Sequence, residues 1–149
     1  MKTRSIVLVI IAGMLGVVGL VDADEQVDLA GVKCPVSGQP VKAASAVEFN
    51  GGKVYFCCNN CPKAFNNDTA KYTDKANHQL ARTGQATQKK CPKTGRNLNP
   101  NTAIDVDGVS VCFCCNGCKG WAQQSEGDEL ITKLFSSDAF AKGFTVGEE

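Results

Sequence analysis

The sequence predicts an α+β chain made of two tandem copies of one small unit, joined by a helix. Each unit is expected to contain a tight turn, a β-hairpin and a short helix. Two observations lead to this fold class. The chain matches itself without a gap when it is shifted by 57 positions. The chain has nine cysteines against one histidine, and eight of these cysteines repeat within that match and offer each small unit a means of cross-linking.

Residues 1–23 have the pattern of a signal peptide. Two basic residues among the first four precede an apolar run from Ile6 to Val21, and Ala23 ends a junction of small or short residues. We therefore predict cleavage after Ala23 and export to the periplasm or the extracellular space. An uncleaved membrane anchor is the alternative, because the apolar run approaches the length that spans a bilayer.

The internal repeat places similar residues of 34–61 and 91–118 in register. Residues 34–38, which read C-P-V-S-G, align with residues 91–95, which read C-P-K-T-G. Residues 54–59 align with residues 111–116, so that two adjacent cysteines coincide, and a further cysteine follows in each copy. Eight cysteines belong to the repeat, and Cys112 is left over. The chain is thus predicted to hold one supersecondary unit twice.

Each copy is expected to fold in the same order of elements. The C-P-x-[S/T]-G segment favours a tight turn, because proline fixes φ and glycine accepts positive φ. A strand near residues 46–49, an Asn-Gly or Asp-Gly hairpin turn, and a return strand over 53–57 or 110–114 should follow. A short helix should then begin near 59–62 in the first copy and near 116 in the second.

The chain divides by these patterns into two units. Residues 33–82 are predicted to form the first unit, including a helix over 68–82 whose apolar residues recur every four positions. Residues 83–89 are polar and predict a linker. Residues 90–145 are predicted to form the second unit with a C-terminal helix, and residues 146–149 a loose tail.

The spacing of the cysteines points to a metal site in each unit. The apolar residues of one unit barely offset the entropy of its chain, so that a metal or a disulfide must stabilise it. Cys34, Cys57 and Cys61 follow the pattern C-x22-C-x3-C. The hairpin would return the second and third cysteines to the opening turn, where three sulfurs could meet. The pattern recurs at Cys91, Cys114 and Cys118.

This pattern, with V-Y-F-C or V-C-F-C ending at the second cysteine, resembles the TRASH and YHS metal-binding domains. The resemblance covers residues 33–72 and 90–122. It implies a treble-clef-like fold, heavy-metal binding, and the six cysteines of the repeated pattern as ligands. The chain departs from the zinc-bearing treble clef at Ser37 and Thr94, which stand where a second cysteine of the turn is usual. Hydroxyls bind soft metals poorly, so the fourth position is open.

Three more cysteines could complete the metal sites. Cys58 and Cys115 form C-x2-C pairs with the last cysteine of each pattern, and alternation places Cys112 on the same strand face as its neighbour Cys114. Three thiolates suit Cu(I) and four suit Zn(II), so that either ion is expected, about one in each unit. The candidate ligands are Cys34, Cys57, Cys58, Cys61, Cys91, Cys112, Cys114, Cys115 and Cys118.

Other functions remain as alternatives at this point. An exported protein commonly pairs its cysteines, which would give a disulfide-stapled interaction module without metal. The C-x2-C pairs at predicted helix starts also allow a dithiol redox protein. We find no phosphate-binding loop or catalytic triad, and the neutral charge argues against nucleic acid as a partner. The expected function is therefore metal binding without enzymatic activity. The expected partners are a metal ion and a metal-handling membrane or exported protein.

The isolated aromatic residues and the single histidine are expected to have structural rather than ligand-binding roles. Tyr55 and Trp121 are expected in or at the rim of the core. His78 is expected on the solvent face of the helix between the units, far in sequence from both cysteine sets.

Overall fold

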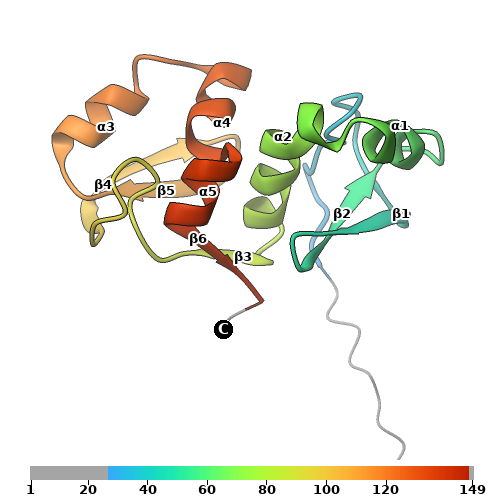
Figure 1. Cartoon of the computed structure of the whole chain (residues 1–149), viewed down its shortest axis with the longest axis horizontal. Coiled ribbons are helices and arrows are strands. Elements are labelled where there is room, and N and C mark those ends of the chain that lie inside the picture. The colour runs from blue at the N-terminus through green and yellow to red at the C-terminus, as the bar shows by residue number, and fades with distance from the viewer. Residues whose placement is uncertain (1–26, 148–149) are drawn as a thin grey trace, which may run out of the picture.

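The computed structural model describes residues 27–147 and confirms the α+β class with two similar halves (Figure 1). Each half has a small antiparallel hairpin and a cysteine cluster. The predicted signal peptide lies outside the described residues. Within residues 27–147, none of the helices has the length and apolarity needed to cross a bilayer.

The first unit contains the elements that its sequence predicts. Its hairpin turns at Asn50 and Gly51, both with positive φ, as an Asn-Gly turn requires. The first strand is longer than expected and carries a bulge between Lys42 and Ala46. The elements are β1 (Lys42–Phe49), β2 (Gly52–Phe56), α1 (Cys61–Asn67) and α2 (Thr69–Arg82).

The second unit repeats this hairpin with the bulge at a matching position, between Asn99 and Ile104. Its turn at Asp107 and Gly108 again has positive φ at both residues. A pair of helices replaces the single long helix of the first unit. The elements are β4 (Asn99–Val106), β5 (Val109–Phe113), α3 (Asn116–Ala122), α4 (Gly127–Phe135) and α5 (Ser137–Gly143).

A third small sheet ties the end of the chain to the segment between the units. β3 (Ala86–Gln88) pairs antiparallel with β6 (Phe144–Val146). The segment predicted as a linker therefore contains a strand. The prediction of a loose tail from residue 146 is wrong at Val146, which pairs with Ala86. Strands of three residues are too short to show the alternation that would have revealed them.

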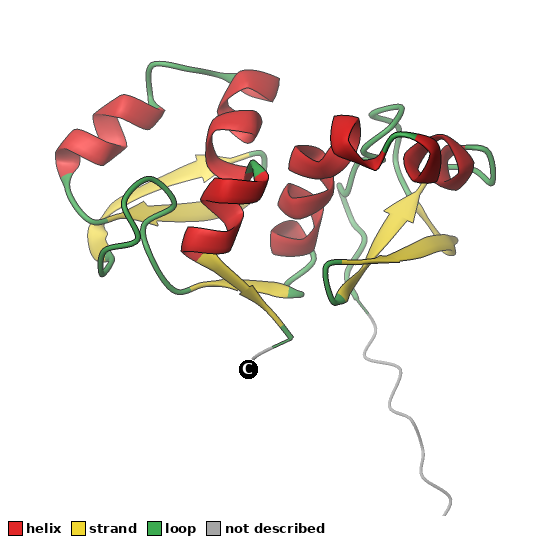
Figure 2. Ribbon diagram, in the orientation of Figure 1, coloured by secondary structure: helices red, strands yellow, loops and turns green. Residues whose placement is uncertain are grey.

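Helix α2 stands between the two hairpins, and α4 and α5 pack beside it (Figure 2). Its predicted start is confirmed, because Asp68 caps the helix and accepts a hydrogen bond from the amide of Lys71 at 3.3 Å. Leu80 and Ala76 are fully buried on this helix. The apolar side chains of both units belong to one core cluster. Helix α2 is therefore part of a core that the two units share, and not only a linker between them.

The prediction that His78 is solvated is wrong. The residue is 8% exposed, and its Nε2 lies 2.8 Å from the carbonyl oxygen of Val106 in the second unit. Its ring packs against that of Phe135 in a T-shaped arrangement, with 4.9 Å between the ring centroids. Burial lowers the pKa of His78, although the hydrogen bond to Val106 opposes that shift. The helix face expected to meet water is covered by the second unit.

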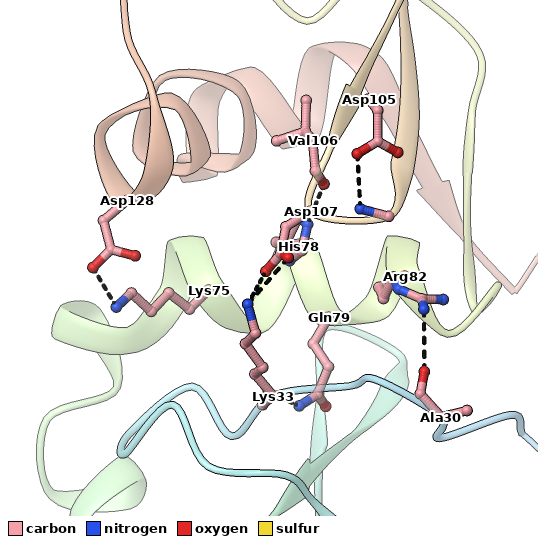
Figure 3. A network of polar contacts seen from close by, with 11 residues as sticks. Ala30, Lys33, Lys75, His78, Gln79, Arg82, Asp105, Val106, Asp107 and Asp128 are labelled. Atoms are coloured by element: carbon pink, nitrogen blue, oxygen red, sulfur yellow. Dashed lines mark hydrogen bonds and ion pairs between the residues drawn. The ribbon is translucent and has the colours of Figure 1, made fainter.

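Two ion pairs link the first unit to the second across their boundary (Figure 3). Lys33 Nζ lies 2.9 Å from Asp107, which sits in the β4–β5 turn, and Lys75 Nζ lies 2.7 Å from Asp128 at the start of α4. The hydrogen bond from Lys33 lowers the pKa of Asp107. Because Lys33 directly precedes Cys34, the opening turn of the first unit is anchored to the second unit.

Candidate metal centres

The C-P-x-[S/T]-G segments form the same turn in both units. In the first unit, the amide of Cys34 donates to the carbonyl of Gln39 at 2.8 Å, and the amide of Gly38 donates back to the carbonyl of Cys34 at 2.8 Å. Gly38 has φ of 72°, which explains the glycine at that position. Residues 91–96 repeat both bonds, at 2.9 and 2.8 Å. We call each of these turns the knuckle. It presents the first cysteine of each pattern.

The knuckle, the return strand and the helix bring three sulfurs together in the first unit. Cys57 directly follows β2, and Cys61 is the first residue of α1, just before Pro62. The Sγ atoms of Cys34, Cys57 and Cys61 all lie within 4.8 Å of one another. The pair Cys57–Cys61 is 3.6 Å apart. We call these three residues triad 1.

The second unit repeats this arrangement. Cys114 follows β5, and Cys118 lies in the first turn of α3. The Sγ atoms of Cys91, Cys114 and Cys118 again lie within 4.8 Å of one another, and those of Cys114 and Cys118 are 3.6 Å apart. We call these residues triad 2. In both triads the first and third cysteines are buried and the middle one is half-buried.

These sulfur spacings fit a metal ion. A metal–sulfur bond of about 2.3 Å places two sulfurs about 3.8 Å apart in a tetrahedral site and about 4.0 Å apart in a trigonal one. The observed 3.6 Å pairs lie close to those values, and the third sulfur of each triad remains within 4.8 Å. A sulfur-only donor set selects soft or borderline ions. The triads are therefore positioned to bind such an ion.

The thiols of each triad differ in acidity. Burial, together with the hydrogen bonds that these thiols donate to neighbouring sulfurs, raises the pKa of Cys61 and of Cys118 to about 12. Burial also acts to raise the pKa of Cys91, but hydrogen bonds from Thr94 and from backbone amides outweigh it and lower the pKa to about 7. The same balance lowers the pKa of Cys34. Each triad thus combines a thiol of lowered pKa with a thiol of raised pKa, whose proton a bound cation must displace.

The two hydroxyl residues of the knuckles contact the middle sulfur of each triad. Ser37 Oγ lies 3.1 Å from Cys57 Sγ, and Thr94 Oγ1 lies 3.3 Å from Cys114 Sγ. A hydroxyl at this distance can donate a hydrogen bond to a thiolate. Ser37 and Thr94 therefore face the triads as hydrogen-bonding groups.

The adjacent cysteines stand at the exposed rim of each triad. Cys58 Sγ lies 3.5 Å from Cys61 Sγ, and Cys115 Sγ lies 3.8 Å from Cys114 Sγ, but neither belongs to the sets of mutually close sulfurs. Hydrogen bonds from the backbone amides of Asn60 and Cys61 lower the pKa of Cys58 to about 7. Backbone hydrogen bonding likewise lowers the pKa of Cys115. Both are accessible sulfurs next to a buried triad.

Cys112 lies outside triad 2 and is half-buried. Its backbone amide and carbonyl are both bonded to the side chain of Gln88. All nine cysteines within residues 27–147 are free thiols. The sulfur contacts of 3.5–3.8 Å are far longer than a disulfide bond of about 2.05 Å.

Comparisons of the chain with protein-family models, with curated proteins and with solved structures give no match.

Proposed function

We propose that this protein is an exported metal-binding protein that holds one soft ion, copper or zinc, in each unit and buffers or transfers it. One observation carries the proposal. Two triads of cysteine sulfurs have the same spacing in sequence and a similar spacing in space, and each is formed by a knuckle, a return strand and a helix. Two copies of one ligand geometry are more than core packing of small apolar thiols requires.

The donor set indicates which ions each unit would take. Three thiolates with a nearby hydroxyl suit trigonal Cu(I), since hydroxyls bind soft metals weakly. A rotation of Cys58 or Cys115 toward its triad would supply a fourth sulfur, which suits tetrahedral Zn(II). Their exposure also offers an incoming ion or partner thiol a first contact, which favours exchange over permanent storage.

The wider biological assignment rests on the sequence. The resemblance to TRASH and YHS domains supports a role in heavy-metal handling, and the N-terminal segment supports export. We propose a metal-handling membrane or exported protein as the partner. The protein is proposed to act as a binding protein rather than as an enzyme.

One observation favours dithiol exchange as a second candidate. Cys58 is exposed with a pKa of about 7, and its sulfur lies 3.5 Å from that of the buried Cys61. An exposed, acidic thiol beside a buried one is typical of dithiol redox pairs. Reduction of a test disulfide by the metal-free protein, lost in Cys58→Ser, would support this function, and failure to reduce it would remove it.

Metal stoichiometry tests the main proposal. The reduced protein is loaded with Cu(I) or Zn(II) without air, and bound metal is measured after desalting. We expect two ions per chain. Cys57→Ser and Cys114→Ser should each remove one ion, and the double variant should bind none. Cys112→Ser is the matched control, because Cys112 is a half-buried cysteine outside both triads. Full stoichiometry in the double variant would refute the proposal.

A further inference from the structure

One glutamine side chain links the knuckle of the first unit to its return strand. Gln79, on α2, donates from Nε2 to the carbonyl of Lys33 at 2.9 Å and to the carbonyl of Tyr55 at 2.9 Å. Its Oε1 accepts from the amide of Tyr55 at 2.6 Å. Lys33 immediately precedes Cys34, and Tyr55 lies two residues before Cys57. The side chain therefore spans the two segments that carry the first and second sulfurs of triad 1.

A different glutamine makes the same three contacts in the second unit. Gln88, on β3, donates from Nε2 to the carbonyl of Lys90 at 3.1 Å and to the carbonyl of Cys112 at 2.8 Å. Its Oε1 accepts from the amide of Cys112 at 2.8 Å. Lys90 immediately precedes Cys91, and Cys112 lies two residues before Cys114. We call these two sets of bonds the glutamine clasps.

The clasps do not follow from the repeat itself. The shift of 57 positions that superimposes the cysteines places Ser136, not a glutamine, opposite Gln79. Gln79 reaches its unit from a long helix, whereas Gln88 reaches its unit from a three-residue strand. Two unrelated positions thus supply the same amide to the same backbone groups. That coincidence indicates that the knuckle and the hairpin need a clasp at this point.

The physical need lies at the outer edge of each hairpin. A two-stranded sheet leaves backbone amides and carbonyls on its outer edges without ladder partners, and buried ones must be satisfied. A glutamine amide has the donor and acceptor of a peptide group and can act as a short piece of neighbouring strand. Because its second donor also reaches the knuckle, it fixes the separation of two ligand-bearing segments. Figure 3 shows Gln79 beside Lys33 at the boundary between the two units.

We propose that Gln79 and Gln88 are positioning residues for the two metal centres, each setting the separation between the first and second thiolates of its triad. The inference rests on the proposed metal binding and names the residues that tune it. Hydrogen bonds just outside a ligand set hold ligands in the geometry that the ion requires. Loss of a clasp should therefore weaken one site and leave the other unchanged.

The chain supplies a matched control on the same strand edge. Gln85 accepts from the amide of Lys53 at 2.6 Å and donates to the carbonyl of Lys53 at 2.8 Å. It caps the edge of β2 as Gln79 does, but its bonds do not reach the knuckle. Methionine has a length close to that of glutamine and lacks the amide. Gln→Met variants thus remove the hydrogen bonds and keep most of the packing.

The experiment measures the Cu(I) affinity of each site in the full chain by competition with a chromophoric chelator. Cys114→Ser isolates triad 1, and Cys57→Ser isolates triad 2. Gln79→Met should weaken triad 1 by about 10–100-fold and leave triad 2 unchanged. Gln88→Met should do the reverse, and Gln85→Met should leave both affinities unchanged. Co(II) charge-transfer spectra should shift only at the site whose clasp is lost.

The outcomes separate this inference from the proposed function. If the unsubstituted chain binds two ions and both clasp variants keep the affinity of the Gln85→Met control, the clasps do not position the ligands and the inference is overturned alone. If the unsubstituted chain binds no metal, the proposed function falls and the inference falls with it. Gln79 is only 2% exposed, so its variant could fail to fold. The half-buried Gln88 then decides the question.

Discussion

Leu80 tests whether α2 unites the two units into one cooperative structure. The side chain is fully buried on the helix that stands between them. A Cβ added at Gly52 would come within 2.8 Å of Leu80 Cδ2, so Leu80 occupies the space that this glycine leaves open beside β2. It also belongs to the core cluster that includes Val111 and Leu134 of the second unit. Leu80→Ala would leave a cavity in this shared core.

The expected cost is large compared with the stability of such a domain. A buried leucine replaced by alanine loses about 2–5 kcal/mol, which combines lost transfer energy and the cavity left behind. The free energy of unfolding of a small domain is only about 5–15 kcal/mol. We expect Leu80→Ala to lower the urea midpoint of the metal-free protein strongly. The complete burial of the residue places the expected loss in the upper half of the range.

The two units carry separate optical probes for this experiment. Both tyrosines, Tyr55 and Tyr72, lie in the first unit, and the single tryptophan, Trp121, lies in the second. In the unsubstituted protein and in Leu80→Ala, tyrosine and tryptophan signals should follow the same transition. A variant that shifts the tyrosine transition and leaves the tryptophan transition in place would refute the shared core.

Three further predictions follow from the site and its surroundings. The metal affinity of triad 2 should rise with pH, because metal binding displaces the proton of Cys118. The rise should be steepest below about pH 7, where binding also displaces the proton of Cys91. Chelator competition at a series of pH values measures this slope. Burial lowers the pKa of His78 in the folded protein below its unfolded value of about 6.5. The stability that this residue confers is therefore complete above about pH 6.5 and is lost as the pH falls toward the pKa of the folded state. His78→Gln should reduce this loss of stability in urea titrations. Gly143→Ala should weaken metal binding by triad 2 in chelator competition, because the added Cβ would lie 3.0–3.2 Å from atoms of the residues flanking Cys91. In Gly120→Ala the added Cβ would meet no atom within 4 Å, so this variant should stabilise α3 by about 0.5–1 kcal/mol.

Each of these predictions has a clear contrary result. A pH-independent affinity would mean that no thiol proton is displaced on binding. A steep acid loss of stability that persists unchanged in His78→Gln would assign the effect to other groups. Equal metal affinities in Gly143→Ala and Gly120→Ala would show that α5 does not support the second knuckle.

The sequence was sufficient for features that repeat or that depend on neighbours along the chain. The shift of 57 positions revealed the two units, and hairpin geometry then explains why cysteines with 22 residues between them meet in space. Asp68 marked the start of α2 because capping is a local interaction. The positive φ at Asn50 and Asp107 is likewise local turn chemistry.

Features that depend on how the units pack could not be read in this way. His78 has the surroundings of a surface residue in sequence, and only the approach of the second unit buries it. The β3–β6 pairing joins segments almost 60 residues apart, and each is too short for a periodic pattern. The glutamine clasps carry no sequence signal, because Gln79 and Gln88 occupy unrelated positions and meet equivalent groups only after folding.

X-ray absorption spectroscopy of the anaerobically loaded protein measures most directly whether sulfurs from the knuckle, the return strand and the helix surround one ion. The expected result is a first shell of three or four sulfurs at about 2.3 Å from the metal. Nitrogen or oxygen as the dominant first shell, or protein whose cysteines are paired as disulfides and which takes up no metal, would contradict it.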